Sequence, residues 1–190
     1  LTGINGMAGV INIILKEYEE STTVREIEYG TFESYRAHIS HGAKIGNLAY
    51  ATGFGMSHTD GPAGRNAQEG MTNFYSSLKW SATEKLTVRF NLFHLDGKRE
   101  IRLAVAPAAK RLLSEISSYD PFRSTLTNLK INYQTSAKSA TEMILYYSDR
   151  RPVYVLQDNK TLVMNRTDEQ DFEWGTNIIH SLALSERNIL

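Results

Sequence analysis

The chain has 190 residues with 21 basic and 21 acidic side chains, so its formal net charge is zero and we expect no nucleic-acid partner. It contains no cysteine, which excludes disulfide bonds, thiolate metal sites and cysteine nucleophiles. No apolar run approaches the roughly 20 residues of a transmembrane helix. A membrane β-barrel is compatible with the absence of such a run, because its apolar residues stand at every second position.

The chain opens on a glycine-rich turn followed by an apolar stretch. Gly3, Gly6 and Gly9 permit a tight backbone path, and residues 10–15 form a run rich in β-branched residues that is typical of a buried strand. Asn12 within that run needs a polar partner. The sequence starts without an initiator Met and stops directly after an apolar, strand-like residue, so we expect an internal piece of a longer protein.

Residues 5–16, Asn-Gly-Met-Ala-Gly-Val-Ile-Asn-Ile-Ile-Leu-Lys, resemble the end of the plug domain in TonB-dependent outer-membrane receptors. In that family a similar segment closes the plug and leads directly into the first barrel strand, and strands are predicted just after it here. The family usually has Thr at the position of Leu15. The resemblance is carried by Asn5, Gly6, Ala8, Gly9, Val10 and Asn12.

The resemblance implies a plugged barrel of roughly 22 strands. Residues 1–20 would be the C-terminal end of the plug domain, and residues 21–190 the N-terminal part of a transmembrane β-barrel, truncated at both ends. It also implies a Gram-negative outer-membrane receptor that imports a scarce metal complex, such as a ferric siderophore, with energy from TonB through the missing N-terminal part. The implied partners are TonB, the metal chelate, outer-membrane lipid and lipopolysaccharide.

Alternation of apolar and polar residues predicts about eight antiparallel strands after residue 20. The clearest is residues 86–92, where Leu, Val, Phe and Leu alternate with Thr, Arg and Asn. The other predicted strands cover residues 22–31, 35–43, 48–56, 74–80, 126–134, 141–147 and 172–182. We therefore expect an all-β fold, an antiparallel transmembrane β-barrel segment that forms an open, curved sheet with two unpaired edges when isolated.

The predicted connections alternate in length from the second one onward. Short turns fall at residues 46–47, 82–85, 136–140 and 185–188. Long, polar, irregular loops are predicted at residues 59–69, 98–122 and 152–170, with a short helix at 108–116 inside the second loop. The first connection, residues 32–34, is short and breaks the pattern. Tight turns at one end and long loops at the other are typical of outer-membrane barrels, whose long loops face outside.

Each predicted strand has one polar and one apolar face. In a barrel the polar residues would point into the lumen, whereas on a soluble sheet they would meet solvent; we favour the lumen, because no layer is predicted to cover the apolar face. The inward set is Glu26, Glu28, Arg36, Arg89, Asn91, Asn128, Lys130 and Asn132, opposite Trp80, Phe90, Leu92, Ile131, Tyr133 and Trp174. Tyr35, Trp80, Tyr133 and Trp174 could form an aromatic girdle at the membrane interface or simply pack across strands.

We expect no catalytic centre, no metal site and no cofactor. His38 and His41 are three residues apart on a predicted strand, so they should point to opposite faces and make poor joint ligands. No nucleophile elbow, phosphate-binding loop or HExxH motif is present. Gly53 and Gly55, within one strand, are interpreted as a close-packing or curvature site.

Basic and aromatic residues gather in the predicted long loops. Arg and Tyr together can hold an anionic metal chelate, although exposed basic loops also suit lipopolysaccharide phosphates. The candidate ligand-binding residues are Arg99, Arg102, Tyr119, Arg123, Arg150, Arg151 and Tyr154. Two other functions stay open, a soluble or surface-exposed β-sheet adhesion or scaffold module and a passive porin.

Overall fold

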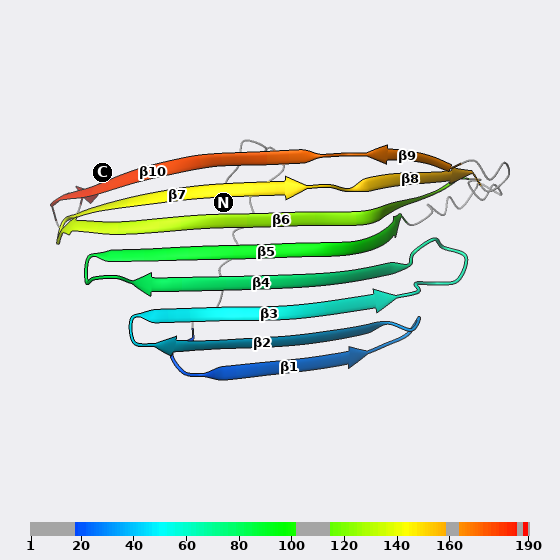
Figure 1. Ribbon diagram of the computed structural model, residues 1–190, viewed down its shortest axis with the longest axis horizontal. Coiled ribbons are helices and arrows are strands. Elements are labelled where there is room, and N and C mark those ends of the chain that lie inside the picture. The colour runs from blue at the N-terminus through cyan, green and yellow to red at the C-terminus, as the bar shows by residue number, and fades with distance from the viewer. Residues whose placement is uncertain (1–17, 102–114, 159–163, 186–187, 190) are drawn as a thin grey trace.

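A computed structural model describes residues 18–101, 115–158, 164–185 and 188–189. These residues form one antiparallel β-sheet without a helix, and Figure 1 shows its strands side by side. The all-β, open-sheet part of the prediction is therefore confirmed. The plug-end positions, the strand expected at 10–15 and Arg102 lie outside the described residues. In the part of the chain that is described, no helix has the length and apolar character needed to cross a membrane.

The strands follow one another across the sheet as a meander from β1 to β7, then β10 and β11, while β8 pairs with β6 and with β9. Within the described residues, β1 pairs on one side only. The strands are β1 (Thr22–Tyr29), β2 (Tyr35–Ile45), β3 (Leu48–Thr59), β4 (Glu69–Ser81), β5 (Leu86–Ile101), β6 (Glu115–Ser136), β7 (Ser139–Arg150), β8 (Val153–Asp158), β9 (Met164–Asp168), β10 (Asp171–Ser185) and β11 (Asn188–Ile189).

The prediction of a long, irregular loop at residues 152–170 is wrong, because β8 and β9 pair as antiparallel strands there. The strand β6 has 22 residues and pairs with β7 along one part and with β8 along another, so β7 and β8 follow the same neighbour. Arg151 and Pro152 separate them, and the Arg151 amide donates to the Arg123 carbonyl at 2.9 Å. The β-branched and aromatic side chains of β8 suit a strand once β6 supplies its hydrogen-bonding partners.

The loop predicted at residues 98–122 is also too long. The strand β5 continues to Ile101, and β6 begins at Glu115. Ile116, at the end of the expected helix, pairs with Gln157 of β8, while residues 108–114 lie outside the described part. Helical spacing is a local pattern, and the strand pairing of Ile116 overrides it. A register shift between Gly97 and Arg99 marks a bulge, where a strand can bend.

Connections of different length lie at opposite ends of the sheet. Figure 1 shows the β2–β3 and β4–β5 turns at the left and the β1–β2 and β3–β4 connections at the right. The two-residue β2–β3 turn contains Gly46 with φ of 57°, as tight hairpin turns require. The predicted separation of short turns from a longer loop is confirmed for the β2–β3, β3–β4 and β4–β5 connections, whereas the β1–β2 connection is short, as predicted, and lies at the same end as the β3–β4 loop. We call the two ends the turn end and the loop end.

The register between strands divides the side chains into two faces. Phe90 lies opposite Leu78 and Leu129, on what we call the apolar face. Asn91 lies opposite Ser77 and Asn128, on the polar face. The predicted division is confirmed, because the register joins Leu86, Val88, Phe90 and Leu92 with Leu129, Ile131 and Tyr133, and joins Arg89 and Asn91 with Lys130 and Asn132.

The described residues do not enclose a hydrophobic core. Phe90 is 40%, Trp80 51% and Trp174 74% exposed on the apolar face, and no large side chain is fully buried in the described part of the chain. An arrangement of two packed sheets, with Phe90 and Ile131 in a shared core, is therefore excluded for these residues. No described residue outside the sheet forms a layer over the apolar face.

Aromatic rings of the polar face pack against glycines on neighbouring strands. A Cβ atom added to Gly53 would overlap the ring of Tyr75, its neighbour in β4. A Cβ atom added to Gly175 would lie 2.5 Å from the hydroxyl of Tyr146 in β7. The interpretation of Gly53 as a close-packing site is confirmed, since only glycine leaves room for the neighbouring ring.

We predict that Gly53→Ala destabilises the sheet by about 1–3 kcal/mol, because the new methyl group overpacks against the Tyr75 ring. Gly70→Ala is the control, since the nearest atom to its added Cβ is His58 Nδ1 at 3.6 Å. Urea unfolding in detergent measures both free energies. The double variant Gly53→Ala/Tyr75→Ala should remove the penalty, and equal losses for Gly53→Ala and Gly70→Ala would contradict the packing argument.

Candidate functional site

A hydrogen-bonded network crosses the middle strands on the polar face. The Ser77 hydroxyl donates to Asn91 Oδ1 at 2.7 Å, and Asn91 Nδ2 donates to Asn128 Oδ1 at 2.8 Å. One strand further, Lys130 pairs with Glu142 at 2.7 Å. These contacts join β4 to β7 through polar groups alone. A face of this kind suits water or a polar protein element.

The apolar residues form a band on the apolar face, and the limit of this band toward the loop end is oblique, because it recedes from β1 to β5. In β1 the apolar residues are Ile27 and Tyr29 at the loop end, whereas in β5 they are Leu86, Val88, Phe90 and Leu92 toward the turn end. One line of directly opposed residues shows the change, being apolar from β2 to β4 and polar from β5 to β7. The line consists of Ile39, Phe54, Phe74, His94, Thr125 and Asp149, and it becomes apolar again at Phe172 of β10.

Each described candidate arginine has a carboxylate partner. Asp149 accepts hydrogen bonds from Arg151 and thereby raises the pKa of that guanidinium. The charges of these arginines are thus balanced within the chain, at positions that are partly exposed to solvent. The pairs are Arg99 with Glu69 at 3.1 Å, Arg123 with Asp96 at 2.6 Å, Arg150 with Asp171 and Arg151 with Asp149 at 2.8 Å.

The sheet does not bring the candidate arginines into one cluster. Arg99 and Arg150 belong to the polar face, opposite Glu69 and Asp171 respectively. Arg123 lies opposite Asp96 on the apolar face. Arg151, which pairs with Asp149, lies beside that same face. Adjacent arginines in the sequence, such as Arg150 and Arg151, therefore bind carboxylates on opposite sides of the sheet.

The two candidate tyrosines do meet. The ring centroids of Tyr119 and Tyr154 are 5.7 Å apart, and Tyr119 also contacts Phe122 at 5.9 Å. Arg99 lies directly opposite Tyr119, so the aromatic cluster has a basic neighbour at the loop end. The sequence analysis did not select Phe122. Its contact with Tyr119 depends on the irregular pairing of β5 with β6, and no local sequence pattern predicts that pairing.

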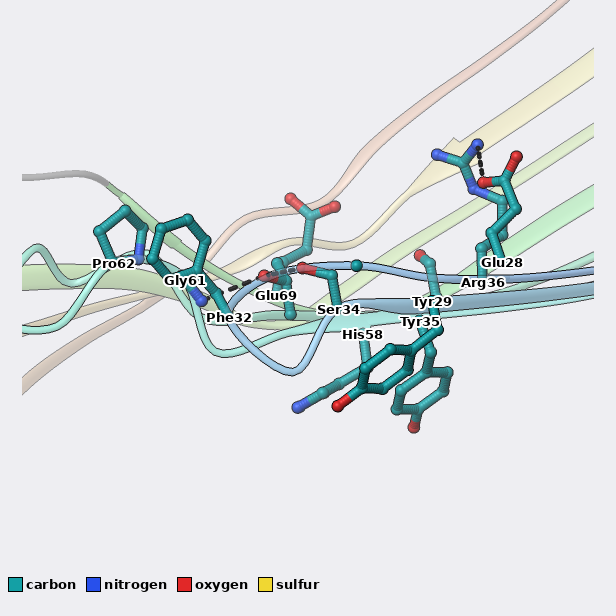
Figure 2. Close-up of a pocket in the computed structure, with 13 residues that line it drawn as sticks. Glu28, Tyr29, Phe32, Ser34, Tyr35, Arg36, His58, Gly61, Pro62 and Glu69 are labelled. Carbon is teal, nitrogen blue, oxygen red and sulfur yellow. Dashed lines mark hydrogen bonds and ion pairs between the residues drawn. The ribbon is translucent and has the colours of Figure 1, made fainter.

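A hollow of about 550 Å³ lies at the loop end of β1 to β4. Figure 2 shows Tyr29, Tyr35 and His58 on one side of the sheet and Glu28, Arg36 and Glu69 on the other. His58 stacks on Tyr35 at 5.3 Å and binds Asp60 at 3.0 Å. Since its lining divides between both faces, the hollow wraps around the end of the sheet and does not enclose a small molecule. No sequence motif pointed to it.

The histidines are distributed over both faces. His38 stacks on Tyr75 at 6.2 Å on the polar face, whereas His41 binds Thr23 at 2.9 Å and Tyr50 at 3.0 Å on the apolar face. Their expected opposite orientation is confirmed by the register. Among the described residues, no three side chains of metal-binding type gather into a group.

Comparison with models of protein families, with curated proteins and with solved structures finds no match to this chain.

Proposed function

We propose that this chain is part of the outer-membrane β-barrel of a TonB-dependent receptor that imports a scarce metal complex, such as a ferric siderophore. The observation that carries the proposal is the apolar band with its oblique limit, which no described layer covers, backed by a hydrogen-bonded polar network on the other face. The apolar face would meet lipid, and the polar face would line the lumen. Residues 1–20 would end the plug, and TonB would act through the part of the protein that precedes them.

The oblique limit of the band supports a barrel over a soluble sheet. Barrel strands are tilted by about 35–45° from the barrel axis, so a horizontal slab of lipid crosses each strand at a different height. The limit of the apolar residues toward the loop end must then shift along successive strands, as it does from Tyr29 in β1 to Leu92 in β5. A soluble adhesion module would need a second layer over Trp80 and Trp174, which are largely exposed.

A passive porin would have the same lipid-facing and lumen-facing sides as an active receptor. The resemblance at residues 5–16 favours the receptor. In this proposal the ligand meets the polar face at the loop end. Arg99, Arg150, Tyr119 and Tyr154 remain candidates there, with Phe122 added by its contact with Tyr119. Arg123 and Arg151 pair with carboxylates of the apolar face and fit lipopolysaccharide phosphates better than an inward ligand.

Fractionation of Gram-negative cells that express the complete gene tests the barrel. The protein should sediment with the outer membrane and migrate faster on gels when it is not heated, because a folded barrel resists denaturation by detergent. A soluble fraction without heat-dependent migration would support the adhesion module instead. An upstream sequence too short to encode a plug would favour the porin.

A matched pair of substitutions tests the direction of the faces. Phe90→Arg should cost about 2–4 kcal/mol, the value for Arg facing lipid near the bilayer midplane, and should impair barrel assembly. Asn91→Arg, on the next residue and the polar face, should leave assembly intact. Heat-dependent gel migration of the complete protein measures both. Equal defects would overturn the assignment of the apolar face to lipid.

A second matched pair tests the ligand site. Arg150→Ala should reduce uptake of the metal chelate, because its side chain belongs to the polar face. Arg151→Ala should leave uptake unchanged at equal amounts of protein in the membrane. Radiolabelled chelate uptake by whole cells measures both variants. Equal uptake by the two would remove Arg150 from the site.

A further inference from the structure

Three polar residues interrupt the apolar face in strands β2 to β4, and we call them the polar seam. The seam consists of His41, Thr52 and Ser76, which are directly opposed in the register. In each strand the seam residue has an apolar residue on either side of it along the same face. These flanking residues are Ala43 and Ile39 in β2, Tyr50 and Phe54 in β3, and Leu78 and Phe74 in β4.

The seam belongs to one part of the sheet. In β5 to β7 the neighbouring line of the apolar face consists of Phe90, Leu129 and Leu145, which are apolar and directly opposed. If the apolar face meets lipid, the seam lies inside the bilayer, because apolar residues flank it toward both ends of the strands. A polar side chain at that depth is costly unless it forms hydrogen bonds.

The hydrogen bonds within the chain satisfy the seam only in part. The His41 ring binds Thr23 at 2.9 Å and the Tyr50 hydroxyl at 3.0 Å. The Thr52 hydroxyl donates to a backbone carbonyl of β4 at 3.1 Å, so its oxygen can still accept a hydrogen bond. The hydroxyl of Ser76, which is partly buried, has no hydrogen-bond partner among the described residues. The seam therefore presents a donor in Ser76 directly beside an acceptor in Thr52.

A second copy of the chain matches this arrangement by symmetry. A two-fold axis parallel to the membrane normal keeps every residue at its own depth. An axis that passes between β3 and β4 places β4 of each copy against β3 of the other, so Ser76 of each copy faces Thr52 of the other and the donor meets the acceptor twice. The small seam side chains also let the two sheets approach closely.

Aromatic residues next to the seam suit the same axis. Phe54 and Phe74 are directly opposed one line further toward the loop end, and they are 44% and 37% exposed. The two-fold axis brings Phe54 of each copy against Phe74 of the other, and aromatic pairs of this kind add stability beyond the area that they bury.

The available area is sufficient for a dimer. The apolar face of β1 to β4 is about 19 Å wide and about 35 Å long, on the order of 700 Å² per copy, which is close to the roughly 800 Å² that each partner buries in a standard interface. A different membrane protein would need a polar row of its own at the same depth. A second copy has that row at that depth by symmetry.

We infer that a second copy of this chain binds the apolar face of β3 and β4, with hydrogen bonds between Ser76 of one copy and Thr52 of the other. The inference rests on the proposed function, since it treats the apolar face as the lipid-facing side of a barrel. It goes beyond that function, because neither a barrel nor uptake of a metal complex requires a dimer.

Oxidative cross-linking of one engineered cysteine tests the contact. The complete protein with Ser76→Cys is oxidised in isolated outer membranes, after any cysteine outside this chain, which has none, is replaced by serine. Thr127→Cys is the matched control, because Thr127 belongs to the same line of the apolar face but to β6, which puts its two copies about 24 Å apart across the axis. Non-reducing gels should show a disulfide-linked dimer for Ser76→Cys and a monomer for Thr127→Cys.

The dissociation constant of the dimer tests the hydrogen bonds. Ser76→Ala removes both donors of the symmetric contact and should raise the dissociation constant about fivefold to tenfold. Phe74→Ala should also raise it, whereas Thr127→Val should leave it unchanged. Sedimentation equilibrium of the complete protein in detergent measures these constants, and heat-dependent gel migration verifies that each variant folds.

The inference and the proposed function fail in different ways. A monomeric protein that sediments with the outer membrane and keeps its heat-dependent migration would overturn the dimer and leave the barrel standing. Equal cross-linking at positions 76 and 127, or a dissociation constant that Ser76→Ala does not change, would overturn the dimer as well. A cross-link from position 76 to a chain of different mass would instead assign the seam to another membrane protein. A soluble protein without heat-dependent migration would reject the barrel, and the inference with it.

Discussion

The cross-strand register of the sheet is the constraint on which the other features depend. Side chains alternate along each strand, so a slip of one residue in any pair would carry Phe90 and its neighbours to the polar side. Contacts on the polar face oppose such a slip. Tyr75 packs where only Gly53 leaves room, and Asn91 binds Ser77 and Asn128 on either side. A slipped pairing would lose both and leave polar groups without partners.

The same register explains why the two faces differ so strongly. Polar residues from four consecutive strands, β4 to β7, reach one another through hydrogen bonds and ion pairs, and these contacts need water or a polar neighbour. The opposite face exposes aromatic and aliphatic side chains over the whole width of the sheet, in a band whose limit toward the loop end is oblique. One layer with two such faces is stable where each face meets a different environment, and we propose lipid as the environment of the apolar face.

Local patterns predicted the strands and their faces well, and failed where distant pairing decides the structure. The alternation in residues 86–92 and 126–134 placed Phe90 and Ile131 on one face correctly. The polar composition of residues 152–170 indicated a loop. However, β6 extends far enough to pair with β8, and β8 pairs in turn with β9. The candidate site shows the same limit. Arg150 and Arg151 are adjacent in the sequence, but the sheet separates their charges, and the contact of Tyr119 with Phe122 depends on irregular strand pairing.

The sequence by itself determined which residues within each strand share a face, because that follows from the twofold period of an extended chain. It also determined the main turns, since glycine at position 46 permits the backbone of a two-residue hairpin. Only the tertiary structure decided which strands are opposed residue by residue. Lys44, Lys79, Arg89 and Lys130 are widely spaced along the chain, and they form one row because hydrogen bonds between strands set their heights relative to one another. That alignment is a property of pairs of strands, and no single strand encodes it.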